Sequence, residues 1–262
     1  MANLPNQIRL NKFLAERLGV SRREADDLIA AGRVLIDENP AKLGDRIDKN
    51  NKVCYSGNII PFETDFLYVA FNKPVGYVCS RRAQGSAPTL YELLPKEYRK
   101  LKTVGRLDKD SSGLILLTND GDFAFQMTHP KFHKEKVYEV ELDHPLEPLH
   151  QQMISDYGVM LDDGPSKFTI VRDMETYLSK GFRSAAARDG TPAARGDGPA
   201  GRDPRKMSSP YRYTVMLSEG RNRQIRRTFA ALGYKVTRLH RTQFGKYQLS
   251  GLAPGKCVII KP

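Results

Sequence analysis

Short apolar blocks alternate with polar turns along this chain, a pattern that predicts many short strands and several short helices. Continuous apolar runs bounded by turn residues, such as residues 114–117, indicate strands that are buried on both faces. We expect strands near residues 34–36, 67–71, 77–79, 114–117, 136–142, 167–171, 211–217, 235–239 and 257–260. We expect helices near residues 11–18, 22–31, 90–94, 122–127, 148–157 and 222–232.

Residues 136–142 are predicted to form a strand whose two faces differ in polarity. Tyr138 shares one face with Val140 and Leu142, while Glu139 and its acidic neighbour two positions on lie on the other face. Tyr138 is therefore expected to point towards the interior. A buried tyrosine often only fills a core and finds one partner for its hydroxyl, so the pattern leaves open whether Tyr138 does more.

Residues 7–60 form a small unit of their own. Ser21 and Glu24 have the spacing of a capping box, in which each side chain bonds the backbone N–H of the other residue. The helix that they open is predicted to end at Gly32, a residue suited to the left-handed conformation of a C-cap. A polar stretch from Gly57 to Asp65 then leads into a larger domain, residues 65–262.

The composition changes between Lys180 and Pro210. This segment holds five Gly, four Pro and six Ala, with seven Lys and Arg against three Asp. Such a stretch buries too little apolar surface to offset the entropy of ordering it. We therefore expect residues 180–210 to be a disordered insertion within a hairpin; its positive charge suits an RNA tether, although an inert solvated loop is the simpler interpretation.

The charge balance points to a polyanionic partner. The chain has 42 Lys and Arg against 30 Asp and Glu, a formal net charge of +12. Nucleic acid and an anionic membrane both satisfy this excess. No apolar run approaches the roughly 20 residues of a spanning helix, and the N-terminus shows no signal-peptide pattern. The sequence therefore favours nucleic acid, and we expect a cytoplasmic protein that does not bind membranes.

Motifs for cofactors are missing from the sequence. The three cysteines, Cys54, Cys79 and Cys257, are far apart and give neither a disulfide framework nor a zinc spacing. His129 and His133 are four apart, but Pro130 argues against a shared helical face. There is no glycine-rich phosphate loop. We expect chemistry by ordinary side chains, without metal or nucleotide cofactor.

Residues 103–121 combine a charged loop with a buried strand. Gly105 and Gly113 bracket the charged residues, and the apolar run 114–117 follows. Such a strand would hold the loop firmly, so that Asp108 would be presented from a rigid base. Taken alone, the segment is equally compatible with an ordinary turn carrying a solvated ion pair.

Four segments resemble motifs of the pseudouridine synthases, in the branch typified by RsuA, RluB, RluE and RluF, and they follow one another along the chain as they do in that branch. They are Gly-Arg-Leu-Asp at 105–108 followed by Ser-Gly-Leu at 112–114, Asn-Lys-Pro-Val-Gly at 72–76, Lys-Val-Tyr at 136–138, and Glu-Gly-Arg-Asn-Arg-Gln-Ile-Arg-Arg at 219–227. The resemblance covers nearly the whole chain apart from the insertion. It implies an α+β fold: a small S4-type αα-β domain followed by a mixed, mainly antiparallel sheet with flanking helices.

The same resemblance implies isomerisation of uridine to pseudouridine in folded RNA. It assigns Asp108 as the carboxylate at the sugar, either as nucleophile on C1′ or as base at C2′. Arg226 matches the guanidinium partner of that carboxylate, and Tyr138 would pack against the base. Arg106 would enter the helix as the uridine flips out. Lys73 lies in a turn placed beside the active site, and Arg223 is expected to look towards it.

The pattern of residues 9–14 and 21–25 resembles the S4 RNA-binding domain. That fold presents a basic helix surface to the phosphate backbone, where such contacts supply affinity more than sequence information. We place there Arg9, Lys12, Arg22, Arg23 and Arg33. The alternative is a solvated helix face, because neighbouring acids dilute the charge.

The substrate expected from this resemblance is ribosomal RNA, free and folded or within precursor particles, bound by a monomer. The Asn222-Arg223-Gln224 form is closer to enzymes of the large ribosomal subunit; small-subunit RNA is the alternative. A function of another class stays open: a non-catalytic, S4-type assembly factor that binds ribosomal RNA. The presence of Asp108, Tyr138 and Arg226 together argues against it.

Overall fold

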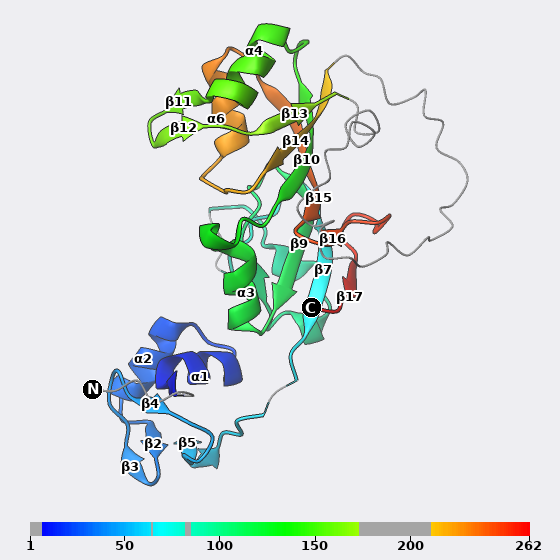
Figure 1. Cartoon of the computed structure of the whole chain (residues 1–262). Coiled ribbons are helices and arrows are strands. Elements are labelled where there is room, and N and C mark those ends of the chain that lie inside the picture. Colours follow the sequence, from blue (N-terminus) through cyan, green and yellow to red (C-terminus); the bar gives the residue numbers. More distant parts are fainter. Residues whose placement is uncertain (1–6, 64, 82–84, 173–210) are drawn as a thin grey trace.

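The computed structural model describes residues 7–63, 65–81, 85–172 and 211–262 (Figure 1). A small N-terminal unit is followed by a larger domain built around one long sheet. The chain is therefore α+β, as the resemblance implied. The expected insertion at 180–210 lies outside the described residues.

Two helices and short strands make up the N-terminal unit. The elements are β1 (Ile8–Arg9), α1 (Leu10–Arg17), α2 (Arg22–Ala30), β2 (Val34–Ile36), β3 (Asn39–Pro40), β4 (Arg46–Ile47), β5 (Val53–Tyr55) and β6 (Asn58–Ile59). Both hydrogen bonds of the predicted capping box are present, between Ser21 and Glu24. Gly32 has a φ of +68° after α2, which confirms the predicted helix end. Phe13, Leu14 and Ile29 lie in the core that joins the helices to the strands.

The larger domain is organised around a sheet whose main path runs β13-β14-β10-β15-β9-β7-β17. Its strands are β7 (Tyr68–Lys73), β8 (Lys102–Val104), β9 (Ser112–Thr118), β10 (Lys136–Leu142), β13 (Thr169–Val171), β14 (Arg212–Leu217), β15 (Val236–Phe244), β16 (Tyr247–Gln248) and β17 (Cys257–Ile259). All pairings are antiparallel except that of β9 with β15. The sheet is therefore mixed and mainly antiparallel.

The parallel joint between β9 and β15 consists of two residue pairs. Ser112 is opposite His240, and Gly113 is opposite Arg241. A Cβ at Gly113 would lie 2.2 Å from the Arg241 carbonyl oxygen, and the φ of Gly113 is +107°. Only glycine permits this backbone approach. The joint connects the half-sheet β7–β9 to the half-sheet β10–β15.

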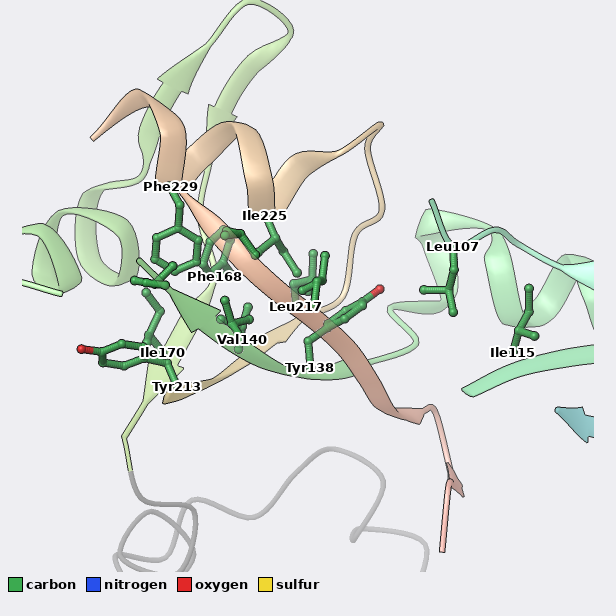
Figure 2. Packing of buried hydrophobic residues seen from close by; sticks show 14 of the residues in the cluster. Leu107, Ile115, Tyr138, Val140, Phe168, Ile170, Tyr213, Leu217, Ile225 and Phe229 are labelled. Carbon is green, nitrogen blue, oxygen red and sulfur yellow. The ribbon is translucent and has the colours of Figure 1, made fainter. Parts of the chain in front are cut away.

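Short helices and turns cover the sheet. They are α3 (Gly121–Thr128), α4 (Pro148–Gln152), a π-helical turn (Met153–Tyr157), α6 (Gln224–Ala231) and the 3₁₀ turns Leu90–Glu92, Lys96–Tyr98 and Pro130–Phe132. A hairpin of β11 (Val159–Leu161) and β12 (Gly164–Ser166) lies beside α6. Ile225 and Phe229 of α6 pack into the core together with Phe168 and Val140 (Figure 2). The helix is thus packed against the sheet by Ile225 and Phe229, while Leu232, just after α6, is half-buried.

The strand expected at 77–79 is not formed. Val78 makes one isolated bridge to Thr89. The physical reason is that β7 already pairs with β9 on one edge and β17 on the other, so no edge is left for a hairpin partner. The helix expected at 90–94 is a 3₁₀ turn, and the one expected at 148–157 becomes π-helical after Gln152.

Polar contacts link the two units. Lys102 donates to the carbonyl oxygens of Ala15 and Val20, at 3.2 and 2.8 Å, and Lys12 pairs with Asp122 at 2.6 Å. Among the described residues, no helix is long and apolar enough to cross a membrane. Within the same part of the chain, no group of three or more His, Cys, Asp or Glu is arranged to hold a metal ion.

Candidate active site

A cavity of about 270 Å³ lies where the two half-sheets meet. It is lined by the loop before β9, by β10 and β15, and by the segment that leads into α6. Asp108 and Tyr138, which the sequence singled out, both line it, as does Arg106. Figure 2 shows the Tyr138 ring extending from β10 to the side on which Leu107 lies. Thr128, at the end of α3, and Pro130, just after it, complete the lining, so the fold brings together residues from five separate segments.

Asp108 lies in a loop that is fixed on several sides. The carbonyl of Lys109 accepts from the N–H of Gly76 at 2.7 Å, and the Cys79 thiol donates to the carbonyl of Leu107 at 3.2 Å. The strand that follows is buried throughout its apolar run, as predicted. The Asp108 side chain is 31% exposed. A carboxylate held this way is rigid but open to a ligand.

Arg223 is the guanidinium nearest to Asp108. Its φ is +47°, and the residue precedes the first turn of α6. Nη1 lies 3.7 Å from a carboxylate oxygen of Asp108. The same guanidinium donates two hydrogen bonds to Asp110, at 3.0 and 2.9 Å. Arg223 therefore bridges two acids of the loop and faces the site, as expected.

Arg226 does not pair directly with Asp108, which corrects the expected contact. Its Nε lies 3.3 Å from Asp110, its Nη2 donates to the Asp110 carbonyl at 2.8 Å, and its Nη1 donates to the Val236 carbonyl at 2.7 Å. The expected and observed partners are two residues apart in the loop, and the loop turns the second acid towards α6. Hydrogen bonds from Arg223 and the charges of both arginines hold the pKa of Asp110 below its usual range.

Tyr138 is buried, at 9% exposure, with its apolar neighbours on β10. Its partner across the sheet is Arg241, whose guanidinium carbon lies 6.0 Å from the centre of the Tyr138 ring. The face predicted from alternation is confirmed. Arg106 is exposed and makes no hydrogen bond or ion pair with the described residues, so its charge is free to meet a ligand.

Lys73, expected in a turn beside the active site, does not line the cavity as described, and its substrate-binding role stays a prediction. The side chain is fully buried, and its ammonium donates to the carbonyls of Pro74 and Ser111, at 3.0 and 2.6 Å. Burial lowers the pKa of Lys73. The residue ties the turn at Pro74 to the loop that carries Asp108.

The cationic residues of the N-terminal unit differ in their surroundings. Arg22 and Arg23 are exposed on α2, and Arg9 is exposed beside α1. Arg33, after α2, is exposed as well. A surface hollow is lined by Arg9, Lys12 and Arg22 together with Gln7, Ile8 and Asn11. Lys12 forms an ion pair with Asp122 of the larger domain, which occupies its charge within the described part of the chain.

Ser111, Lys136 and Arg241 are polar residues that line the cavity but were not among the site residues expected from the sequence. Lys136 opens the same strand as Tyr138, and its ammonium lies among three backbone carbonyls. Burial and the charge of Arg241 lower the pKa of Lys136 to about 8. Arg241 lies within the 236–244 strand between His240 and Thr242, and this polar sequence gave no signal of its place in the site.

Comparison with known proteins agrees with this geometry. The family model for RNA pseudouridylate synthase matches residues 67–231, and the model for the S4 domain matches residues 8–53. The chain is 35% identical over 95% of its length to the ribosomal small subunit pseudouridine synthase A of Yersinia pestis, covering 93% of that protein. It is 32% identical over 93% of its length to the ribosomal large subunit pseudouridine synthase B of Pseudomonas aeruginosa, covering 56% of that protein.

A solved structure described as a pseudouridylate synthase matches over 97% of this chain and 96% of its own, with a TM-score of 0.60 and 28% identity. The family matches span both units, and the aspartate motif falls inside the larger one. The chain therefore belongs to the RNA pseudouridylate synthase family, and its N-terminal unit is an S4 domain.

Proposed function

We propose that this chain isomerises a uridine of folded ribosomal RNA to pseudouridine, with Asp108 as the carboxylate that acts at the sugar. The observation that carries the proposal is the cavity that Asp108 and Tyr138 share, with the exposed Arg106 at the same cavity. The reaction breaks the N1–C1′ bond, turns the base and rejoins it through C5. It needs no redox partner, only a rigid carboxylate beside the sugar and a pocket for one extruded base.

In this proposal Arg223 and Arg226 hold the loop that carries Asp108 in place and also balance its negative charge. Arg223 lies 3.7 Å from the Asp108 carboxylate, while Arg226 fixes the backbone at Asp110. Tyr138 supplies the surface on which the base packs. Arg106 takes the space that the uridine leaves, because flipping costs a few kcal/mol that new contacts must offset.

Small-subunit RNA is the first candidate substrate. Four further relatives named ribosomal small subunit pseudouridine synthase A, from Pasteurella multocida, two Salmonella strains and Escherichia coli, are 32–33% identical and are covered over 94% of their length. Large-subunit RNA is the second candidate, favoured by the Pseudomonas aeruginosa relative and by the Asn222-Arg223-Gln224 form. We further propose that a monomer acts in the cytoplasm, on free RNA or on precursor particles.

The test is a map of pseudouridine in both ribosomal RNAs from a strain that lacks the gene. Carbodiimide-dependent stops of reverse transcription mark each pseudouridine. We expect one stop to disappear and to return with the wild-type gene but not with Asp108→Asn. A stop lost from the small-subunit RNA supports the first candidate, and one lost from the large-subunit RNA supports the second. Unchanged maps, with tight RNA binding by the purified protein, would favour the non-catalytic assembly factor.

A further inference from the structure

Arg241 is a buried cation without a described counter-ion. The residue is 2% exposed, and its Nε donates to the Leu114 carbonyl at 2.7 Å. Its Nη2 is buried and has no hydrogen-bond partner among the described residues. No carboxylate of the described part of the chain forms an ion pair with it. A buried charge left unpaired is costly, so such a group in a native fold needs an explanation.

Arg241 is near the cations Lys73 and Lys136, and its guanidinium carbon lies 4.8 Å from the centre of the Phe244 ring, so no carboxylate compensates its charge among the described residues. Its charge helps to lower the pKa values of Lys73 and Lys136, although burial is the larger cause for each. Of the acids that line the cavity, Asp108 lies near Arg223 and Glu219 lies 3.6 Å from Arg221. The part of the cavity around Arg241 therefore favours binding of a negatively charged group from a ligand.

We propose that Arg241 is a catalytic residue: its guanidinium binds an oxygen of the target uracil and stabilises the negative charge that the base acquires when its bond to the sugar breaks. The inference rests on the isomerisation proposed above. The position fits this task, because Arg241 lies opposite Tyr138 on β15, and Tyr138 is the proposed surface for the base. Ser111 supports it, since this hydroxyl also lines the cavity and is buried without a partner among the described residues.

Both routes open to Asp108 release the base as an anion. If the carboxylate attacks C1′, an O–C1′ bond forms as N1–C1′ breaks; if it removes the proton from C2′, a C1′–C2′ double bond forms. In either case the electron pair of the N1–C1′ bond stays on the base and is shared with O2 and O4. C5 then supplies the pair for the new bond to C1′, and either Asp108 leaves or C2′ regains its proton. Finally the C5 proton is lost and N1 is protonated.

A hydrogen-bond donor placed where negative charge develops during the reaction stabilises the transition state more than the ground state. Removing Arg241 should therefore slow the bond-breaking step and leave RNA affinity unchanged. The effect should be smaller for a base that leaves more readily. Fluorine at C5 withdraws electrons and makes the departing anion less basic, so 5-fluorouridine needs less help from the guanidinium.

The experiment measures single-turnover loss of the N1-linked nucleoside, using ribosomal RNA that carries either uridine or 5-fluorouridine. We expect Arg241→Met to slow the uridine substrate by about 100-fold. On 5-fluorouridine we expect Arg241→Met to lower the single-turnover rate by no more than about tenfold. Arg241→Lys keeps the positive charge, so we expect it to lower the rate on uridine by an intermediate factor. Arg238→Met is the matched control on the same strand; Arg238 is half exposed and pairs with Glu139 at 3.1 Å.

Equal losses on both substrates would overturn the inference and assign Arg241 to the support of β9. A weaker RNA affinity with an unchanged single-turnover rate would also overturn it and indicate a phosphate contact. Thermal unfolding shows whether Arg241→Met is folded. If it is not, the rates on uridine and 5-fluorouridine are compared for Arg241→Lys and Arg241→Gln instead. If the wild-type chain modifies no ribosomal RNA, the proposed function itself fails, which is a separate result.

Discussion

Arg223 donates to both carboxylate oxygens of Asp110, at 3.0 and 2.9 Å. The same guanidinium lies beside Asp108, the proposed catalytic acid, so the positive charge of Arg223 is shared between Asp108 and Asp110. Paired, charge-assisted bonds fix geometry as well as charge. The loop therefore presents two acids with different tasks, one accessible in the cavity and one that anchors α6.

Asp108→Asn is expected to lower pseudouridine formation by at least about 10³-fold. The amide keeps the shape of the side chain but removes both the nucleophile and the base. Because Asp108 is 31% exposed, we expect the melting temperature and the RNA affinity to change little. Product assay, thermal unfolding and filter binding check the three parts. Substantial product from this variant would refute the assignment.

Arg226→Ala is expected to lower the single-turnover rate by about 100-fold, because a small misplacement of the reacting group has an effect of that size. The variant removes the contacts that hold the Asp110 backbone and carboxylate. RNA affinity should fall much less. Arg227→Ala is the matched control from the next position of α6, where the side chain pairs with exposed acids. A wild-type rate for Arg226→Ala would contradict the prediction.

The S4 domain should contribute affinity through phosphate contacts. Replacing Arg9, Arg22 and Arg23 by Gln is expected to flatten the slope of log K against log salt by about 2, since each phosphate contact adds somewhat less than one unit. The measurement is RNA binding over a series of salt concentrations. Lys42, Lys49 and Lys52, exposed in the loops between β3 and β5, give a control with the same change of charge. Equal slopes for the two triple variants would discard the claim.

Lys136 should make stability depend on alkaline pH. Its pKa is lowered from an ordinary value of 10.5 to about 8, so between these values the unfolded chain binds more protons than the folded one. Stability from this residue therefore rises with pH across that window, by no more than about 3 kcal/mol. In urea unfolding, the difference in free energy between wild type and Lys136→Met should shift in favour of the wild type from pH 8 to 10.5. A difference that is constant with pH would contradict this.

Gly113→Ala tests the parallel joint of the sheet. The added Cβ would lie 2.2 Å from the Arg241 carbonyl oxygen, at a φ of +107°, and we expect a loss of about 3–5 kcal/mol of stability. Gly251→Ala is the control: its φ is +77°, but nothing lies within 4 Å of the added atom. That variant should lose about 1 kcal/mol. Similar losses for the two, measured by urea unfolding, would contradict the prediction.

Local periodicity was enough to predict several elements. The capping box at Ser21 and the inward face of Tyr138 are confirmed, since each depends on residues within a few positions. The strand expected at 77–79 was wrong, because its formation depended on whether β7 had a free edge. Whether a strand has a free edge depends on how the whole sheet is assembled, and a short stretch of sequence does not contain that information.

The chemistry of the site was harder to predict than its strands. Lys73 is buried because two carbonyls converge on its ammonium, and one of them belongs to Ser111, 38 positions away. The partner of Arg226 depends on which acid of a short loop faces α6. Arg241 gave no motif at all; its position becomes meaningful only when β15 meets β9. The functional expectations for Asp108 and Arg106 stay predictions until the variants are assayed.

The pairing of Ser112 with His240 closes a loop of chain that spans 128 positions. β15 also carries Arg241, which lies opposite Tyr138 of β10. One wall of the cavity therefore comes from a strand near the C-terminal end of the chain, far in sequence from the Asp108 loop on the other side. A chain that ends before β15 cannot enclose the cavity, even though the S4 domain and the Asp108 loop are both present.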